Sequence, residues 1–235
     1  MSFLTVNGIE CVRGRVTLPL TGVWVADVVC ETENDQASFP APGSSISLQI
    51  GGQGFQGVVR RASSPFGTVF ARLVGGAGGF PTDIGAVAYQ NTTVQTILSD
   101  ILSSCGESLS PSSDQERLSQ SIPSWVRVAS PGWMAMANLV DALDVSGTWR
   151  VQPSGQVWLG TDTFPQTSIE TFELLNYEPQ ELRAVIYSDN PTVLPGQSFL
   201  GGEITSVEHH VEPGKITASI LFLDQQLAKV EANGV

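Results

Sequence analysis

The sequence has no long apolar run, few basic residues and only two histidines. None of the apolar stretches in its 235 residues approaches the ~18 residues that cross a bilayer. Residues 1–8 also lack the charged segment followed by an apolar one that a signal peptide has. We therefore expect a soluble chain. With 41% hydrophobic residues it can bury one large core or two modest ones.

Basic residues are scarce. The chain has 11 lysines and arginines and 23 aspartates and glutamates, so its formal net charge is -12. The acidity increases toward the C-terminus, where residues 146–235 carry 4 basic and 11 acidic side chains. This balance opposes nucleic-acid binding that works by neutralising phosphates with Lys and Arg. It suits either ordinary solubility or a negative surface that DNA passes without binding.

Three cysteines, Cys11, Cys30 and Cys105, cannot all pair within the chain. Two of them lie in strand-like runs, where a buried thiol behaves as a small hydrophobe. We expect reduced, structural thiols. The sequence contains no Cys-x-x-Cys, so it predicts neither a zinc site nor a thioredoxin-like redox pair.

The first third of the chain has the pattern of antiparallel β-structure. Asn7-Gly8 between short apolar runs is a strong two-residue hairpin signal, and Thr21-Gly22 is a second turn. The run at residues 23–30 is apolar on both faces, as is typical of a central strand. A meander of three further strands, each bounded by glycine or proline, is expected at residues 45–50, 55–62 and 68–74.

From Thr92 the apolar period changes from two to about 3.6, which predicts helices. Thr92 and Gln95 form a capping box, and Gly106 is a suitable end for the first helix. Ser130-Pro131 supplies the cap and first-turn proline that begin a second helix. The apolar stripes of the two helices are Val94, Ile97, Leu98, Ile101 and Leu102, and Met136, Leu139, Val140 and Leu143.

Period two returns at residues 148–160, where Trp149 and Val151 face Val157 and Leu159 across a turn and predict a hairpin. Turn residues then separate three long expected strands at residues 182–188, 199–211 and 216–223. A third short helix is expected at residues 224–230.

Gly52, Gly54 and Gly57 match the dinucleotide fingerprint G-x-G-x-x-G. The fingerprint needs a helix that begins at its end and directs N–H groups at a pyrophosphate. Here Val58-Val59 continues as a strand instead. We therefore expect a tight hairpin at these glycines and no cofactor.

His209 and His210 are adjacent in a predicted strand, so their side chains point to opposite faces and cannot chelate one metal together. Glu208 and Glu212 share the face of His210, which predicts a polar outer face. A metal-binding or acid–base role is the alternative. Both histidines are also candidate interface residues.

The sequence gives little support for catalysis. It contains no G-x-S-x-G, and a cysteine nucleophile would have to recruit one of the two histidines from far away in the chain. Its carboxylates are too many and too scattered to nominate a glycosidase pair. We expect no catalytic residue, no resident metal and no enzyme.

Four of the five tryptophans, all except Trp24, lie in or beside the helical stretch and divide into two groups. Trp125, Trp133 and Trp149 lie on apolar stripes, which predicts core packing. Trp158 alternates out of the apolar face of its hairpin, so we expect it to be exposed and to lie at an interface.

Three segments occur in an order that resembles one known family. The helix at residues 92–102 comes first, the helix end at 139–143 leads into the hairpin at 147–160, and a turn at 194–198 precedes the long strand at 202–210. In this order they are similar to phage tail hub or baseplate hub proteins, which cap the tail tube above the central spike. The first segment resembles the helix that begins the inserted domain of that family.

The resemblance implies a mainly β (α+β) fold, in which two tube-like antiparallel β-barrel units flank a small α/β insertion with two amphipathic helices. The expected divisions are residues 1–90, 91–165 and 166–235. It further implies a homotrimeric ring in the baseplate of a virion, made in the host cytoplasm. That ring would join the tail tube or distal tail proteins to the central spike, and DNA would pass through its lumen without specific binding.

Two other hypotheses remain at the level of the sequence. A carbohydrate-binding or host-adhesion module of a tail tip would use Trp158 to stack on a sugar ring. A hydrolase would depend on His209 or His210.

Overall fold

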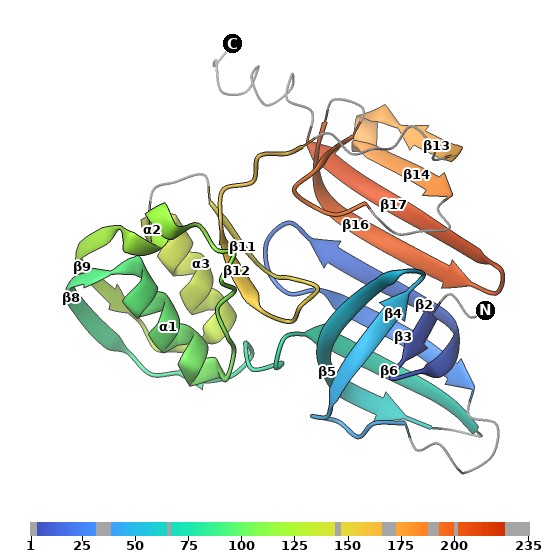
Figure 1. Ribbon diagram of the computed structural model, residues 1–235, viewed down its shortest axis with the longest axis horizontal. Coiled ribbons are helices and arrows are strands. Elements are labelled where there is room, and N and C mark those ends of the chain that lie inside the picture. Colours follow the sequence, from blue (N-terminus) through green and yellow to red (C-terminus); the bar gives the residue numbers. More distant parts are fainter. Residues whose placement is uncertain are drawn as a thin grey trace.

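The computed structural model describes residues 4–31, 39–64, 67–143, 147–165, 173–187, 193–199 and 202–223. They form a β-barrel, an open sheet that continues from the barrel, and a helical module at one end (Figure 1). Within these ranges no helix combines the length and the apolar character that a membrane span requires.

Six antiparallel strands close into the barrel in the order β1-β4-β5-β6-β3-β2, and the pairing of β1 with β2 completes the circle. Their bounds are β1 (Leu4–Val6), β2 (Ile9–Pro19), β3 (Val25–Glu31), β4 (Ser45–Ile50), β5 (Gln53–Ser63) and β6 (Thr68–Gly75). Asn7 and Gly8 have φ angles of 50° and 82°, which confirms the first predicted hairpin. The fingerprint glycines lie in the tight β4–β5 hairpin, as predicted.

The sheet does not stop at the barrel, because β2 also pairs with β16. From there it continues through β17 and β14 to β13. The bounds are β13 (Glu173–Glu178), the 3-10 helix η2 (Pro179–Glu181), β14 (Arg183–Tyr187), β15 (Ser198–Phe199), β16 (Gly202–Glu212) and β17 (Lys215–Leu223). The mainly β fold with a helical insertion is confirmed. Among the described residues, the C-terminal unit is an open continuation of the first barrel.

The barrel interior is filled by alternate residues of each strand, with the largest side chain, Trp24, only 1% exposed. Trp24 packs edge-on against Phe55 with the ring centroids 5.7 Å apart. Gly57 and Gly75 lie against its indole, and a Cβ atom at either position would overlap the ring. These glycines are therefore required for close packing at this end of the barrel.

The helical module joins two helices, a short third helix and three small ribbons of strands. Their bounds are β7 (Asp83–Ile84), β8 (Val87–Thr93), α1 (Val94–Cys105), α2 (Gln115–Ser119), β9 (Ser121–Arg127), β10 (Ser130–Pro131), α3 (Gly132–Ala142), β11 (Thr148–Val151) and β12 (Val157–Gly160). The two long helices lie between the β8–β9 ribbon and the β11–β12 hairpin (Figure 1). Trp149 pairs with Leu159 and Val151 with Val157, which confirms the predicted hairpin register.

The helix ends differ in detail from the prediction. The N-cap of α1 is Thr93, whose side chain accepts from the N–H of Thr96, so the predicted capping box at Thr92 is one residue early. Gly106 ends α1 in the left-handed conformation, as expected. The N-cap of α3 is Pro131 without a side-chain hydrogen bond, and the Ser130 hydroxyl instead donates to a preceding carbonyl.

A buried carboxylate ties the helical module to the barrel. Glu107, just after α1, accepts hydrogen bonds from the N–H groups of Ala77 at 2.8 Å and Gly79 at 2.9 Å. These residues belong to the glycine-rich connection that leaves β6. Burial raises the pKa of Glu107, while the N–H donors oppose that rise. These two hydrogen bonds hold the glycine-rich connection at a defined place beside the end of α1.

Three other expectations need correction or lie outside the structure. Cys11 and Cys30 are cross-strand neighbours in β2 and β3 and form a disulfide, so the expectation that all thiols are reduced is wrong. Only the register of these strands brings the two cysteines together, and the sequence does not reveal that register. Trp133 is 47% exposed, in contrast to the predicted core position. The helix expected at residues 224–230 lies outside the described residues.

Candidate interaction surfaces

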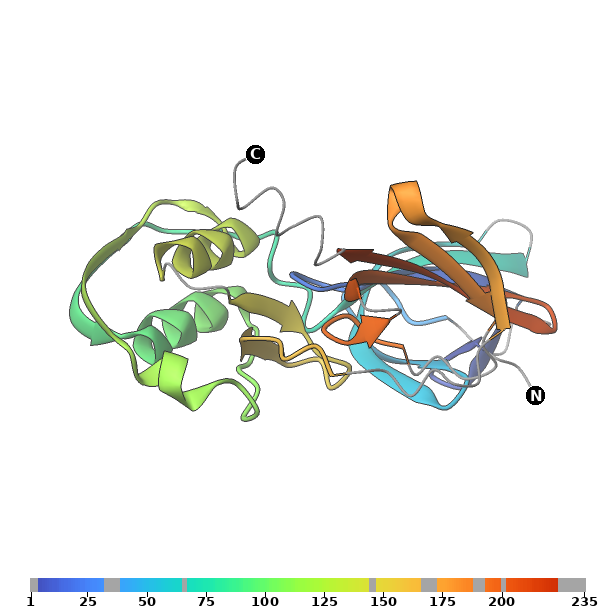
Figure 2. The same ribbon diagram turned by 90° about the horizontal axis from the view of Figure 1, so that it is seen from above.

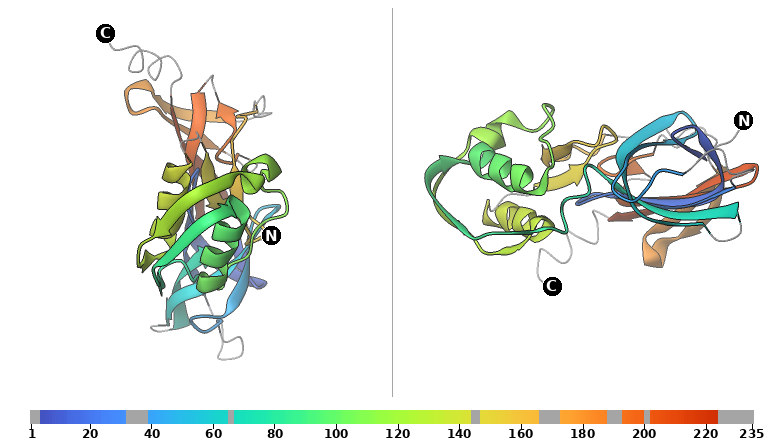
Figure 3. Two further views of the ribbon diagram at one scale, coloured as in Figure 1. Left: turned by 90° about the vertical axis from the view of Figure 1, so that its left-hand side faces the viewer. Right: turned by 90° about the horizontal axis from the view of Figure 1, so that it is seen from below.

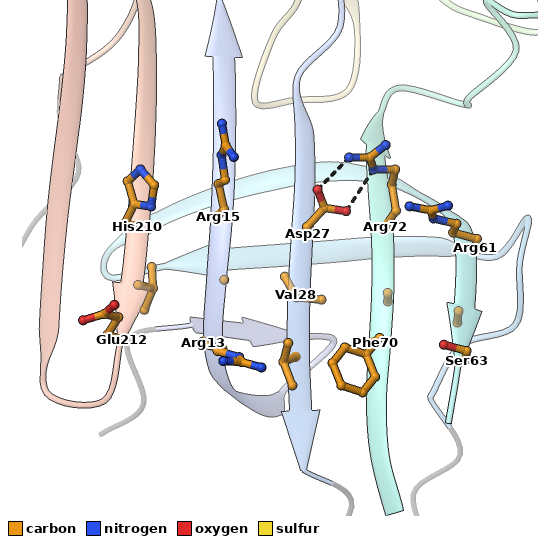
Figure 4. Close-up of a pocket in the computed structure, with 15 residues that line it drawn as sticks. Arg13, Arg15, Asp27, Val28, Arg61, Ser63, Phe70, Arg72, His210 and Glu212 are labelled. Atoms are coloured by element: carbon orange, nitrogen blue, oxygen red, sulfur yellow. Dashed lines mark hydrogen bonds and ion pairs between the residues drawn. The ribbon is translucent and has the colours of Figure 1, made fainter. Parts of the chain in front are cut away.

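A row of charged residues crosses five strands on the outer face of the sheet. The strand registers place His210 beside Arg15, Arg15 beside Asp27, Asp27 beside Arg72, and Arg72 beside Arg61. We call these five residues the charged ladder. They project from the same face, as Figure 4 shows. Directly opposed residues in a sheet lie within reach of one another, so the ladder can form a cross-strand ionic network.

Part of this network is satisfied internally. Arg72 binds Asp27 through two parallel hydrogen bonds of 2.9 Å and 2.7 Å, and this pairing raises the pKa of Arg72. Glu208 accepts from Arg15 and lies 2.6 Å from His210. Burial tends to raise the pKa of Glu208, but these two partners outweigh it and hold the pKa below its ordinary value.

Positive charge remains in excess on this face. Arg13 and Arg61 are exposed, and no ion pair joins either of them to another described residue. Between them lies Phe70, which is 42% exposed (Figure 4). The hollow that these residues line has a volume of ≈ 640 Å³. Although the chain is strongly acidic overall, this surface is suited to carboxylates or another acidic partner.

The two histidines lie on opposite faces, as predicted. His210 belongs to the polar outer face with Glu208. His209 is fully buried on the other face, and neither of its ring nitrogens has a hydrogen-bond partner among the described residues. Burial, with a smaller contribution from His210, lowers the pKa of His209 to about 4. A shared metal site for the pair is thus ruled out by geometry.

Trp158 is half-buried and held by its own chain. The guanidinium of Arg150 lies 4.3 Å from the centroid of its indole ring, and the indole Nε1 donates to the carbonyl of Ser112 at 3.1 Å. Arg150 is fixed in turn by two hydrogen bonds to Asp162, of 2.9 Å and 2.7 Å. One ring face is therefore occupied by an internal cation, which leaves less of Trp158 available to a sugar or partner than its position in the hairpin suggests.

The outermost strand of the open sheet carries exposed apolar residues. β13 is the last strand of the sheet in the described part of the chain, so the backbone groups on its outer edge have no strand neighbour there. Leu174 is 48% exposed and Leu175 is 45% exposed. β13 and β14 project away from the barrel (Figures 2 and 3). An apolar strand edge of this kind is a template for pairing with another chain.

The helical module presents a smaller apolar surface. Val126 and Val128 are 62% and 60% exposed, on the ribbon side that faces away from the helices. The opposite side of the ribbon is buried, where Arg127 binds Asp100 at 2.9 Å and the carbonyl of Gly85 at 2.9 Å. The two valines are thus held on a rigid support, as a contact surface requires.

Neither a protein family nor a curated protein matches this sequence. Solved structures match it along nearly its whole length. The c3393 protein of E. coli is a component of the type VI secretion system and resembles the T4 bacteriophage tail proteins gp27 and gp5. It matches with a TM-score of 0.66 at 12% identity, over 95% of this chain and 77% of that protein.

Two prophage or tail proteins match similarly. The 43 kDa tail protein of prophage MuSo2 from Shewanella oneidensis gives a TM-score of 0.66 at 10% identity, over 94% of this chain and 95% of that one. The tail protein of Neisseria meningitidis MC58 matches with a TM-score of 0.62 at 11% identity. The match covers 94% of this chain and 96% of that protein. The chain has the fold of tail proteins. This fold confirms the resemblance to tail hub proteins that the order of the sequence segments indicates.

Proposed function

We propose that this chain is a structural component of a phage tail or a related injection machine. Three copies would form a hub ring in the baseplate of the virion, joining the tail tube or distal tail proteins to the central spike. The observation that carries the proposal is the exposed edge strand of the sheet, on a chain that has the fold of tail proteins. The barrel is closed, but among the described residues the sheet that continues from it ends at β13, whose outer edge has no strand neighbour there and which carries exposed leucines.

We propose a homotrimer as the assembled state, and the β13 edge supports it as a surface that a neighbouring copy could cover. A strand edge with apolar side chains is costly to leave in water, and pairing it with a neighbouring copy satisfies its backbone groups and buries its leucines. The binding energy of the ring would lie in these contacts, so the function needs no catalytic residue and no cofactor. We propose that the protein is not an enzyme and that it is made in the host cytoplasm before assembly.

The exposed arginines on the face of the charged ladder bear on where DNA would pass through the ring. No ion pair joins Arg13 or Arg61 to another residue in the described ranges, and a channel wall with such exposed arginines would hold phosphates. We therefore place this face away from the channel, against an acidic neighbouring subunit or partner. The net charge of -12 then leaves the remaining surface unfavourable to DNA binding, as a passage for DNA requires.

The experiment is the solution mass by light scattering, with a matched pair of variants. The wild type is expected at three times the chain mass. Leu175→Lys should shift it to the monomer, because it introduces charge at the strand edge. Val126→Lys, at a similarly exposed position on the helical module, is the control and should leave the trimer intact. A wild-type monomer that also fails to assemble on tail-tube proteins would refute the proposal.

A further inference from the structure

A threefold ring needs two different surfaces on each copy that fit each other. One patch that pairs with itself gives a twofold dimer, whereas contacts between two different patches can close into a ring. The β13 edge supplies only one of these patches. If the proposed ring is correct, the next copy must therefore receive β13 at another place.

Strand β5 has a second free edge. β4 pairs with β5 only as far as Val58, after which the N–H of Gly43 donates to the carbonyl of Val59. From there to Ser63, β5 pairs with β6 on one side, and within the described ranges no strand lies on its other side. Figure 1 shows β5 and β13 far apart on the molecule. The β13 strand of one copy can therefore reach only the β5 edge of another.

A β-bulge places two arginines at this edge of β5. The register of β5 against β6 shifts between Val59 and Arg61, so Arg60 is an extra residue. Both arginines are exposed, and no ion pair joins either of them to another described residue. Arg61 is the outermost member of the charged ladder (Figure 4), and the carboxylate of the ladder, Asp27, already binds Arg72. The edge thus carries positive charge that suits an acidic strand.

Strand β13 carries carboxylates on the same face of the sheet. Directly opposed residues of neighbouring strands share a face. The pairs His210–Thr217, Thr217–Tyr187 and Tyr187–Glu173 therefore place Glu173 on the face of the charged ladder. Glu178 pairs four residues away from Tyr187 along β14, so it lies on this face as well. One face of β13 is thus acidic where the matching face of β5 is basic.

The other faces of the two strands are both apolar. Leu174 and Tyr177 lie opposite buried residues of β14 and are 48% and 43% exposed. On β5, Ala62 lies on the face opposite to Arg61 and packs against the barrel core. If β13 lies beside β5, its carboxylates meet arginines on one face and its apolar side chains meet apolar side chains on the other.

We propose that the free edge of β5, residues 60–63, receives β13 of the neighbouring copy. The sheet then continues from one copy to the next around the ring. Backbone hydrogen bonds between the two edges hold the copies together, and Glu173 and Glu178 beside Arg60 and Arg61 select this edge over others. The contact joins two different strands, so three copies can close into a ring.

Charge reversal at the β5 edge tests this pairing by light scattering. Arg60→Glu combined with Arg61→Glu should change the mass from three chains to one, because like charges then oppose each other across the contact. Lys215→Glu is the control and should stay trimeric, because it lies in the β16–β17 hairpin, whose two strands both have neighbours. Circular dichroism should show all three proteins folded, since the arginines are exposed.

The outcomes separate this inference from the ring itself. A trimeric wild type whose mass is unchanged by the double arginine variant would show that β13 binds elsewhere, and the inference would be wrong while the ring stands. A monomeric wild type would refute the ring, and the inference with it.

Mixing two defective chains tests the head-to-tail arrangement. Leu175→Lys keeps the β5 edge intact, and the double arginine variant keeps β13 intact. Each should be a monomer alone, and an equal mixture should give a particle of two chain masses, because one intact contact joins the two chains and no further one remains. Pairing of β13 with β13 would instead give a dimer of the arginine variant alone. That result, or a mixture that stays monomeric, would overturn the inference.

Discussion

Lowering the pH from 7 to about 5 should cost this protein about 2 kcal/mol of stability through His209 alone. His209 is fully buried and unpaired among the described residues, and its pKa is lowered from 6.5 to about 4. In the unfolded chain it should titrate near the ordinary value. Between these two values the unfolded state binds the proton and the folded state does not, so stability falls as the pH falls through this window.

The magnitude follows from the size of the shift. A difference of about 2.5 pKa units corresponds to about 3 kcal/mol when the pH lies below both values, at about 1.4 kcal/mol per unit. Roughly two thirds of this is lost by pH 5, where the unfolded histidine is almost fully protonated. Typical domains have only about 5–15 kcal/mol in total, so the effect is large enough to measure.

The assay is urea unfolding at pH 7 and pH 5 for the wild type and for His209→Leu, which keeps the volume and removes the titrating group. The wild type should lose about 2 kcal/mol more than the variant. His210→Gln is the control for the exposed neighbour and should behave like the wild type in this difference. If the wild type and His209→Leu lose the same stability, then His209 is not protonated on unfolding and the reasoning is wrong.

Three further substitutions test the contacts that hold the parts together, each by urea unfolding combined with limited proteolysis. Glu107→Ala should cost about 1–3 kcal/mol and increase cleavage in the connection after β6, because it removes the acceptor of two backbone N–H groups. Gly79→Ala should cost about 4 kcal/mol or more, since a Cβ atom there overlaps the backbone at the end of α1. Arg150→Lys should cost about 1–2 kcal/mol, because lysine cannot bind Asp162 through two bonds while it stacks on Trp158. A change below about 0.5 kcal/mol in any of them would contradict the role given to that contact.

Local signals predicted much of the fold. Asn7-Gly8 and the alternation around Trp149 depend on interactions within a few residues, and both hairpins form with the predicted pairing. The edge strand β13 was not predicted, because all but the last of its side chains are exposed and it therefore has no alternating pattern. Helix α2 was also missed, although Asp114 caps its first turn, because five residues are too few to show a helical period.

The candidate surfaces were less accessible to sequence reasoning. The opposite faces of His209 and His210 follow from strand geometry alone and were predicted. The charged ladder was not, because it joins β16, β2, β3, β6 and β5, and the register between distant strands is set by tertiary structure. The local signal of the charged ladder in the sequence was the alternation of Arg13 and Arg15 along one strand, which places both side chains on the same face. Trp158 was predicted to be exposed, but its stacking partner Arg150 becomes apparent only when the hairpin is paired.

Electron microscopy of the purified protein tests the central claim most directly. If three copies pair through the β13 edge, averaged images should show a ring with threefold symmetry and an open centre, and Leu175→Lys should abolish it. A compact particle of single-chain size, present at the same concentration and unchanged by Leu175→Lys, would contradict the account.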